Sequence, residues 1–334
     1  MKKIVTISTL SAVIASLLLA NEPVKFEKKL IKERNNIGYK YTGEKVEYKI
    51  PDESTIPNNQ FGDLIKYGKE LIVHTYKYIG PEVENEKMRY AGNNLSCQSC
   101  HLEAGTKAYS APFIGTSAAF PQYRPREDSI GTLADRINGC MQRSMNGKPL
   151  PVESKEMRAM EAYMFWLSQG IPLGAEVEGR GLHEINRKMI QTTKADPVKG
   201  KAVYDMHCAS CHGENGEGVK NEGKANGYMF PPLWGDDTYN KGAGMYRTLK
   251  AADFIRSNMP IGATKENPIL TDEEAYNVAV YMNLDEHKRP EKANRDKDFP
   301  DAKVKAPDAY IEGKDSTDRK FGPFGQFIKL NNKQ

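Results

Sequence analysis

Two five-residue motifs of this chain carry the same chemistry. They read Cys97-Gln98-Ser99-Cys100-His101 and Cys208-Ala209-Ser210-Cys211-His212. The pattern Cys-x-x-Cys-His is typical of c-type haem attachment, in which both thiols bond to the haem vinyl groups and the histidine binds iron. The sequence therefore predicts two covalently bound haem c groups, held by Cys97, Cys100, Cys208 and Cys211, with His101 and His212 as iron ligands. Cysteine pairs also occur in zinc sites, but the histidine after each pair favours haem.

Each haem iron needs a second axial ligand from elsewhere in the chain. For the second motif Met259 is the best candidate, because it stands in a loop before Pro260 and a thioether ligand suits an electron-exit haem. Met229 and Met245 are the alternatives. For the first motif the candidates are Cys140, Met141, Met145 and His74. Spacing alone does not separate Cys140 from Met145, because either thiolate or thioether can ligate haem iron.

Cys140 is the one cysteine of five that neither motif uses. Arg136 and Ser144 lie four residues before and after it, so that on a helix the three side chains share one stripe. Gly139 would let the backbone approach a flat macrocycle closely. If Cys140 is merely buried, the sequence indicates an electron carrier. If Cys140 binds iron, its position between Arg136 and Ser144 indicates an enzyme active site.

Further arginines stand just upstream, where Arg124 and Arg126 flank Pro125. A lone thiol with several guanidinium groups nearby predicts a site for an anionic sulfur compound, because guanidinium binds oxyanions through paired donors. The alternative is that these arginines form ordinary surface ion pairs. Their candidate partners are Glu127, Asp128 and Asp135.

The N-terminus resembles an export signal. Residues 1–20 begin with Lys2 and Lys3 and continue as an apolar stretch that ends in Leu18-Leu19-Ala20. Export fits haem attachment and predicts a periplasmic protein without stable membrane insertion after cleavage; the alternative is an uncleaved anchor helix. Loss of the two lysines lowers the formal charge from +4 to +2, and four haem propionates would bring it to about −2. Nucleic acid is therefore not an expected partner.

The rest of the sequence predicts an all-α protein with two cytochrome c-like haem domains in tandem. An irregular N-terminal arm (21–60) precedes the first domain (61–172), and a linker (173–195) leads to the second (196–290) and an irregular C-terminal tail (291–334). Helices are expected from Phe61 and Ser154 onward by their apolar spacing. Other starts carry capping residues. These are Thr132 with Asp135, Asp196 with Pro197, and Thr271 with Glu274.

The segment from Asn93 to Pro151 resembles the dihaem c-type thiosulfate dehydrogenases, which form tetrathionate. The matching stretches are 95–102, 120–124 and 136–147. The resemblance implies that the first haem is the active site, with His101 and Cys140 as ligands. It implies that the second haem transfers electrons, with Met259 as ligand, because Asn258-Met259 stands where some members have lysine. It also implies catalytic roles for Arg126, Arg136 and Ser144, with Arg124 close enough to take the place of Arg126.

The function implied by this resemblance is the interconversion of thiosulfate and tetrathionate in the periplasm, with a small cytochrome c as redox partner. The preferred direction stays open. Two rival functions remain. One is a dihaem electron carrier with Met145 as ligand, and the other is a sulfur-oxidation cytochrome whose modified cysteine serves a carrier protein. A dihaem peroxidase is less favoured, because nothing in the sequence specifies its open or histidine-bound site.

Overall fold

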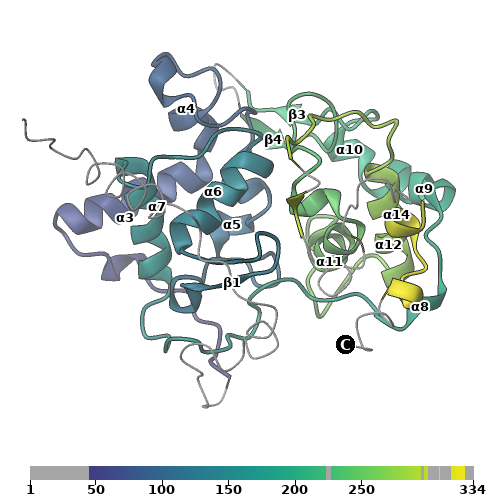
Figure 1. Cartoon of the computed structure of the whole chain (residues 1–334), viewed down its shortest axis with the longest axis horizontal. Coiled ribbons are helices and arrows are strands. Elements are labelled where there is room, and N and C mark those ends of the chain that lie inside the picture. Colours follow the sequence, from purple (N-terminus) through teal and green to yellow (C-terminus); the bar gives the residue numbers. More distant parts are fainter. Residues whose placement is uncertain (1–44, 223–226, 295–296, 300–307, 309–316, 328–334) are drawn as a thin grey trace, which may run out of the picture.

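The computed structural model describes residues 45–222, 227–294, 297–299, 308 and 317–327. The predicted signal (1–20) lies outside the described residues, as do much of the N-terminal arm and of the C-terminal tail. Two helical domains stand side by side, with α3 to α7 in one and α9 to α14 in the other (Figure 1). Among the described residues, no helix has the length and apolar character that crossing a membrane requires.

The first domain is built on two long helices, α3 (Gln60–Val73) and α7 (Lys155–Leu167). Both predicted starts are confirmed, because the side chains of Asn59 and Ser154 accept hydrogen bonds from the first turns. The helices cross closely at Gly68, where an added Cβ would lie 2.0 Å from the carbonyl oxygen of Ala159. The crossing therefore requires glycine.

Shorter elements complete the first domain. The predicted capping box is present, with Thr132 and Asp135 bonding to each other's backbone at the start of α6 (Leu133–Arg143). A small antiparallel hairpin, β1 (Gln122–Arg124) with β2 (Ser129–Gly131), precedes it and departs from the all-α expectation. The remaining helical turns are η3 (Glu53–Thr55), α4 (Thr75–Ile79), η4 (Glu86–Met88), η5 (Cys97–Ser99), α5 (Leu102–Gly105) and η6 (Ser117–Ala119).

The second domain repeats the plan with α9 (Pro197–His207) and α12 (Asp272–Met282). The Asp196 cap and the Thr271–Glu274 capping box are both confirmed. The crossing again falls at a glycine, because a Cβ on Gly200 would lie 2.2 Å from the carbonyl oxygen of Asn277. The other elements are α10 (Ala209–His212), β3 (Val219–Lys220), β4 (Tyr228–Phe230), η7 (Gly244–Tyr246) and α11 (Thr248–Asn258).

Segments predicted to be irregular contribute ordered packing. The linker contains α8 (Met189–Thr192), and the tail contains α14 (Thr317–Phe321), which lies near α12 in Figure 1. Phe324 is fully buried: its ring contacts Tyr276 and its N–H donates to the carbonyl of Ile190. The described part of the tail therefore completes the core of the second domain.

A seam of buried amides fixes the two domains against each other. Asn93 is fully buried and donates to the carbonyl oxygens of Ser144 and Thr238, both at 2.9 Å. Asn240 donates to the carbonyl of Gln142 at 2.9 Å. Buried amides of this kind are costly unless every hydrogen bond is made, so they specify one arrangement of the two domains.

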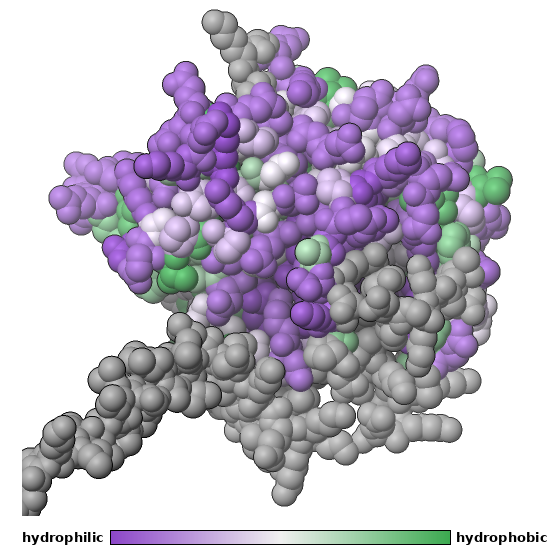
Figure 2. All heavy atoms as spheres, turned by 45° about the horizontal axis from the view of Figure 1, so that its top comes forward, coloured by the Kyte–Doolittle hydropathy of each residue, from purple (hydrophilic) through white to green (hydrophobic). Residues whose placement is uncertain are grey.

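The face of the molecule shown in Figure 2 is mainly hydrophilic, and its apolar residues are scattered.

Candidate functional site

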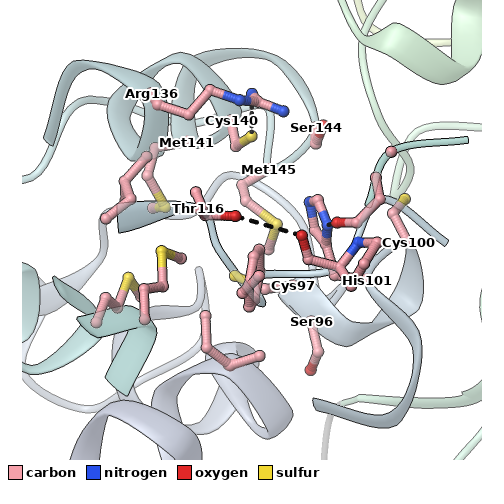
Figure 3. Close-up of a pocket in the computed structure, with 18 of the residues that line it drawn as sticks. Ser96, Cys97, Cys100, His101, Thr116, Arg136, Cys140, Met141, Ser144 and Met145 are labelled. Atoms are coloured by element: carbon pink, nitrogen blue, oxygen red, sulfur yellow. Dashed lines mark hydrogen bonds between the residues drawn. The ribbon is translucent and has the colours of Figure 1, made fainter. Parts of the chain in front are cut away.

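The first haem motif and Cys140 line the same cavity. Cys97, Cys100 and His101 form part of its wall, and Arg136, Cys140 and Ser144 come from α6 and its C-terminal end (Figure 3). Much of the remaining wall is apolar. It includes Ile72, Leu95, Phe113, Ile137, Met160 and Met164. The structure therefore brings a thiol, an imidazole and a guanidinium to one largely apolar enclosure.

His101 is oriented for metal binding. Its Nδ1 lies 2.6 Å from the carbonyl oxygen of Ala111, and its ring lies against Phe113 with centroids 4.5 Å apart. A carbonyl oxygen only accepts, so Nδ1 carries the proton and Nε2 is left as the ligand atom. His212 has the same arrangement in the second domain, with Nδ1 2.8 Å from the carbonyl oxygen of Pro231.

The sulfur of Cys140 is held by a charged donor. Arg136, one turn earlier on α6, donates from Nη1 to Sγ at 3.0 Å. Burial raises the pKa of this thiol, but Arg136, His101 and Arg143 outweigh burial and lower the pKa of Cys140 to about 5. Cys140 is therefore a thiolate at neutral pH, which is the form that ligates iron and attacks sulfur.

Two more guanidinium groups cover the same face of α6. Arg124 and Arg143 share the carboxylate of Glu127, at 2.8 and 3.3 Å. A Cβ on Gly139 would lie 2.6 Å from Nη2 of Arg143 and 3.0 Å from Nη2 of Arg124. Gly139 thus makes room for these arginines, a role that the sequence did not suggest. The alternative of an ion pair holds for Arg124, which pairs with Glu127, but this one carboxylate serves two cations.

Arg126 points elsewhere. Its Nη1 donates to the carbonyl of Gly242 at 2.9 Å and to Asp298 at 2.8 Å, and its guanidinium lies 4.6 Å from the centre of the Phe299 ring. Arg126 is absent from the described residues that line the Cys140 cavity. The catalytic role implied for it by family resemblance therefore stays a prediction.

The alternative ligands of the first iron are placed differently. Met145 and Met141 line the same cavity as Cys140 and are fully buried, whereas His74 lines the cavity of the second domain. A thioether is also available to the first iron, so position alone does not exclude Met145. The charge around the thiol favours Cys140, because Arg136 stabilises a thiolate and has no comparable effect on a thioether.

The second-domain cavity contains the second motif and Met259, which caps the end of α11. Met245 and Met229 line it too, but Met229 is 56% exposed. Asn258 is buried and donates to the carbonyl oxygens of Tyr109 and Phe254, so it anchors the loop that carries Met259. Met259 and Met245 remain the better-buried candidates for the sixth ligand.

The residues present fit haem c in both cavities. Burial raises the pKa of the attachment thiols, to about 11 for Cys97 and about 12 for Cys100 and Cys208. Each pair of thiols lines a cavity beside its own motif histidine, as haem c attachment requires, whereas zinc needs several convergent thiolates or imidazoles. Among the described residues, no three His, Cys, Asp or Glu side chains gather in that way. The zinc alternative therefore has no support in the structure.

The two cavities share a wall. Leu95, Ser96 and Cys100 line both of them, so one short segment that includes a haem-attachment cysteine separates the first site from the second. This segment follows Asn93, which lies in the buried amide seam between the domains. The fold therefore brings the two sites next to each other.

Sequence reasoning missed part of the first site. Gln122, Arg180 and Gly181 line its cavity, yet Arg180 and Gly181 fall in the predicted linker. Tyr109 and Ala111 donate to the carbonyl oxygens of Gly179 and Gly181, and these bonds bring the linker to the wall. No periodicity or motif marks such a contact, because it joins two irregular segments.

Comparison with known proteins gives the family. Residues 87–173 match the family model described as SoxA/TsdA, cytochrome c domain, and residues 197–284 match that of cytochrome c. The thiosulfate dehydrogenase of Stutzerimonas stutzeri (strain A1501) is 41% identical over 73% of this chain and 73% of the relative. That of Allochromatium vinosum is 39% identical over 72% of this chain and 84% of the relative.

A solved structure agrees with these matches. The thiosulfate dehydrogenase (TsdBA) of Marichromatium purpuratum has a TM-score of 0.66 and 33% sequence identity to this chain. The match covers 74% of this chain and 51% of that one, so the chain spans about half the length of this relative. The architecture of two tandem cytochrome c domains is thereby confirmed.

Proposed function

The chain belongs to the thiosulfate dehydrogenase family, and from this premise we propose that it oxidises thiosulfate to tetrathionate at Cys140. The reaction is 2 S2O3²⁻ → S4O6²⁻ + 2 e⁻, and it can run in either direction. The observation that carries the proposal is the hydrogen bond from Arg136 to the sulfur of Cys140, in the cavity that contains His101. A plain electron carrier has no need of an ionised, charge-stabilised sulfur.

The chain offers ligands for two covalently bound haem c groups. Cys97 and Cys100 would hold the first, and His101 and Cys140 would bind its iron. Cys208 and Cys211 would hold the second, and His212 and Met259 would bind its iron. When bound, these groups supply one-electron redox chemistry, so that two of them accept the two electrons of one turnover.

Charge repulsion is the main obstacle that the protein must offset. Two dianions with charge centres about 6 Å apart repel by roughly 10 kcal/mol at an effective dielectric near 20. Arg136 lines the cavity, and Arg124 and Arg143 lie beside it with one shared carboxylate. These groups bind the sulfonate oxygens or reduce their repulsion. The Ser144 hydroxyl, on the same wall, donates a further hydrogen bond.

Cys140 does the covalent work. Its thiolate bonds to the outer sulfur of one thiosulfate with loss of two electrons: Cys–S⁻ + S2O3²⁻ → Cys–S–S–SO3⁻ + 2 e⁻. The outer sulfur of a second thiosulfate then attacks the adduct at the sulfur that lies between Sγ and the sulfonate group. The bond from that sulfur to Cys140 Sγ breaks, so that tetrathionate leaves and the thiolate is restored. The first step is an oxidation whose two electrons leave the site, and the second is thiol–disulfide exchange chemistry, in which a low thiol pKa makes Cys140 a good leaving group.

We place this reaction in the periplasm. The apolar N-terminal segment with its two lysines supports export, and haem attachment fits that compartment. The electrons leave through the second domain to a small cytochrome c. Arg136 acts on the substrate in this proposal, whereas Arg126 meets Asp298 rather than the cavity.

The test uses the purified holoprotein with thiosulfate and ferricyanide, and tetrathionate with a reduced dye for the reverse reaction. Cys140→Met should lower thiosulfate oxidation at least a thousandfold, because it removes the nucleophile. Met145→Leu, which removes the rival candidate ligand on the wall of the same cavity, should retain most activity. Full activity of the Cys140→Met variant would overturn the proposal and favour the electron-carrier reading with Met145 as ligand.

A further inference from the structure

The Cys140 cavity meets a surface groove, and Arg180 lies at the junction. Gln122, Arg180 and Gly181 line both the cavity and the groove. Other groove residues include Lys45, Tyr109, Glu178 and Lys265. Any ion that passes from solvent through this groove to the cavity therefore meets Arg180.

The Arg180 guanidinium has no partner among the described residues. Neither its side chain nor that of Gln122 makes a hydrogen bond or ion pair in this part of the chain. Burial alone lowers the pKa of Arg180, with no neighbouring charge to oppose it. Glu178, two residues away, already pairs with Lys45 at 2.6 Å and accepts from Tyr109. Burying part of a cation without a counter-ion costs free energy, so an anion is expected to bind the Arg180 guanidinium and offset that cost.

The backbone around Arg180 is held in place. Tyr109 donates to the carbonyl of Gly179 at 2.7 Å, and Ala111 donates to that of Gly181 at 2.8 Å. Both glycines have positive φ, +77° and +95°, which a larger residue would adopt only under strain. Ala111 is also the residue whose carbonyl orients His101. Arg180 is thus fixed in relation to the iron-binding imidazole.

Gln122 is fixed as well. It is the first residue of β1 and pairs with Gly131 across the hairpin. Its amide can donate beside the guanidinium at the same junction, since both residues line the cavity and the groove. A guanidinium and an amide together supply several N–H donors, which suits a planar or tetrahedral oxyanion.

We propose that Arg180 and Gln122 form an oxyanion site at the mouth of the Cys140 cavity. Its ligand is a carboxylate or sulfonate, and two sources have this chemistry. One is a propionate of the haem c in this cavity, and the other is thiosulfate on its way to Cys140. Only the thiosulfate arm of the test rests on the proposed function.

The test compares Arg180→Gln, Arg180→Lys and Gln122→Leu holoproteins with an Arg158→Gln control. Arg158 is an exposed arginine of α7 that pairs with Glu153 and lines neither the cavity nor the groove. Haem content by absorbance verifies that each variant is folded and loaded. Two quantities are then measured, the KM for thiosulfate with its kcat, and the reduction potential of the first haem by spectroelectrochemical titration.

A sulfonate ligand predicts that Arg180→Gln raises the KM roughly tenfold or more with kcat and potential nearly unchanged, because a charged hydrogen-bond partner is lost. A propionate ligand predicts a lower potential of the first haem with an unchanged KM, because removal of a nearby cation favours the ferric state. Arg180→Lys keeps the positive charge, so its KM or potential should change less than that of Arg180→Gln. Gln122→Leu should also show a smaller change in the same direction.

The inference is overturned if Arg180→Gln equals Arg158→Gln in both the KM and the potential. If the unaltered protein does not oxidise thiosulfate, the proposed function fails by itself. In that case two other quantities test whether Arg180 binds an oxyanion. These are the reduction potential of the first haem and the dissociation constant of thiosulfate, obtained by titration of the haem spectrum. Equality of both quantities in the two variants would again overturn the site.

Discussion

Replacement of Asp298 by Asn tests what Arg126 does. Asp298 belongs to the C-terminal segment, and its carboxylate pairs with Arg126 of the first domain at 2.8 Å and with Lys292 at 3.3 Å. The ring of the next residue, Phe299, lies 4.6 Å from the guanidinium group of Arg126 and 5.0 Å from that of Arg247. The N–H of Phe299 also donates to the carbonyl of Arg126 at 2.8 Å. The segment therefore ties the two domains together at Arg126.

The size of the effect follows from burial. The side chains of Arg126 and Asp298 are only 14% and 16% exposed. Removing one partner of a buried ion pair costs about 3–5 kcal/mol. The Asn side chain keeps a neutral acceptor, and Arg126 keeps its bond to Gly242, so about 2–3 kcal/mol is expected. At about 2–4 °C per kcal/mol for the two domains unfolding as one unit, the melting temperature should fall by roughly 5–10 °C.

The assay is thermal unfolding of the holoprotein, followed by circular dichroism and by haem absorbance. Asp205→Asn is the matched control, because Asp205 forms an exposed pair with Lys201 on α9 and should contribute less than about 1 kcal/mol. A double-mutant cycle with Arg126→Gln should give a coupling energy of at least about 1.5 kcal/mol. A melting temperature for Asp298→Asn equal to that of Asp205→Asn would refute this reasoning.

The same variant separates two roles of Arg126. If Arg126 binds thiosulfate, Asp298 competes with the substrate, and Asp298→Asn should lower the KM. If Arg126 only joins the domains, stability falls and the KM stays constant. We expect the second outcome, because the guanidinium already meets a carbonyl oxygen, a carboxylate and an aromatic ring. A KM that falls severalfold would assign Arg126 to the substrate.

Three further outcomes are expected. Arg136→Gln should lower kcat/KM for thiosulfate about 10–100-fold, measured with ferricyanide, because Cys140 loses a charged donor. Met259→Leu should change the reduction potential and spectrum of the second haem; unchanged values would favour Met245 as ligand. Burial raises the pKa of Asp308, but the ion pair with Arg247 outweighs burial and holds this pKa below its usual value. The charged Asp308 carboxylate therefore stabilises the folded protein above about pH 4, and this stabilisation is lost as the pH falls. Asp308→Asn should therefore melt lower at pH 7, and its melting temperature should fall less than the parent's between pH 5 and pH 3.

Local signals in the sequence predicted the helices because each depends on a few neighbouring residues. Thr132 with Asp135, and Thr271 with Glu274, form capping boxes whose bonds all lie within one turn. The contact of Arg136 with Cys140 followed from helical spacing in the same way. Such capping and spacing patterns lie within a few consecutive residues, so they can be recognised without knowledge of the tertiary structure.

The contacts that escaped prediction join distant segments. Arg126 meets Asp298 in the predicted irregular tail, and Arg180 reaches the cavity from the predicted linker. Neither segment has a periodic pattern, because its side chains pack singly against surfaces made by other parts of the chain. The hairpin of β1 and β2 was missed for a related reason, since strands this short are defined by their pairing rather than by alternation.

The two domains share one helix crossing but place their second candidate ligands differently. Gly68 and Gly200 permit the same close helix crossing in each, against Ala159 and Asn277. The difference lies in where the second candidate ligand stands. Cys140 is inside a helix, which places Arg136 one turn earlier on the same face and gives the sulfur a charged donor. Met259 follows the end of α11, where a neutral thioether needs no such support. In the proposed function Cys140 must react as well as ligate, so its helical neighbour Arg136 controls the charge of its sulfur, whereas Met259 would only tune electron transfer and needs no such neighbour.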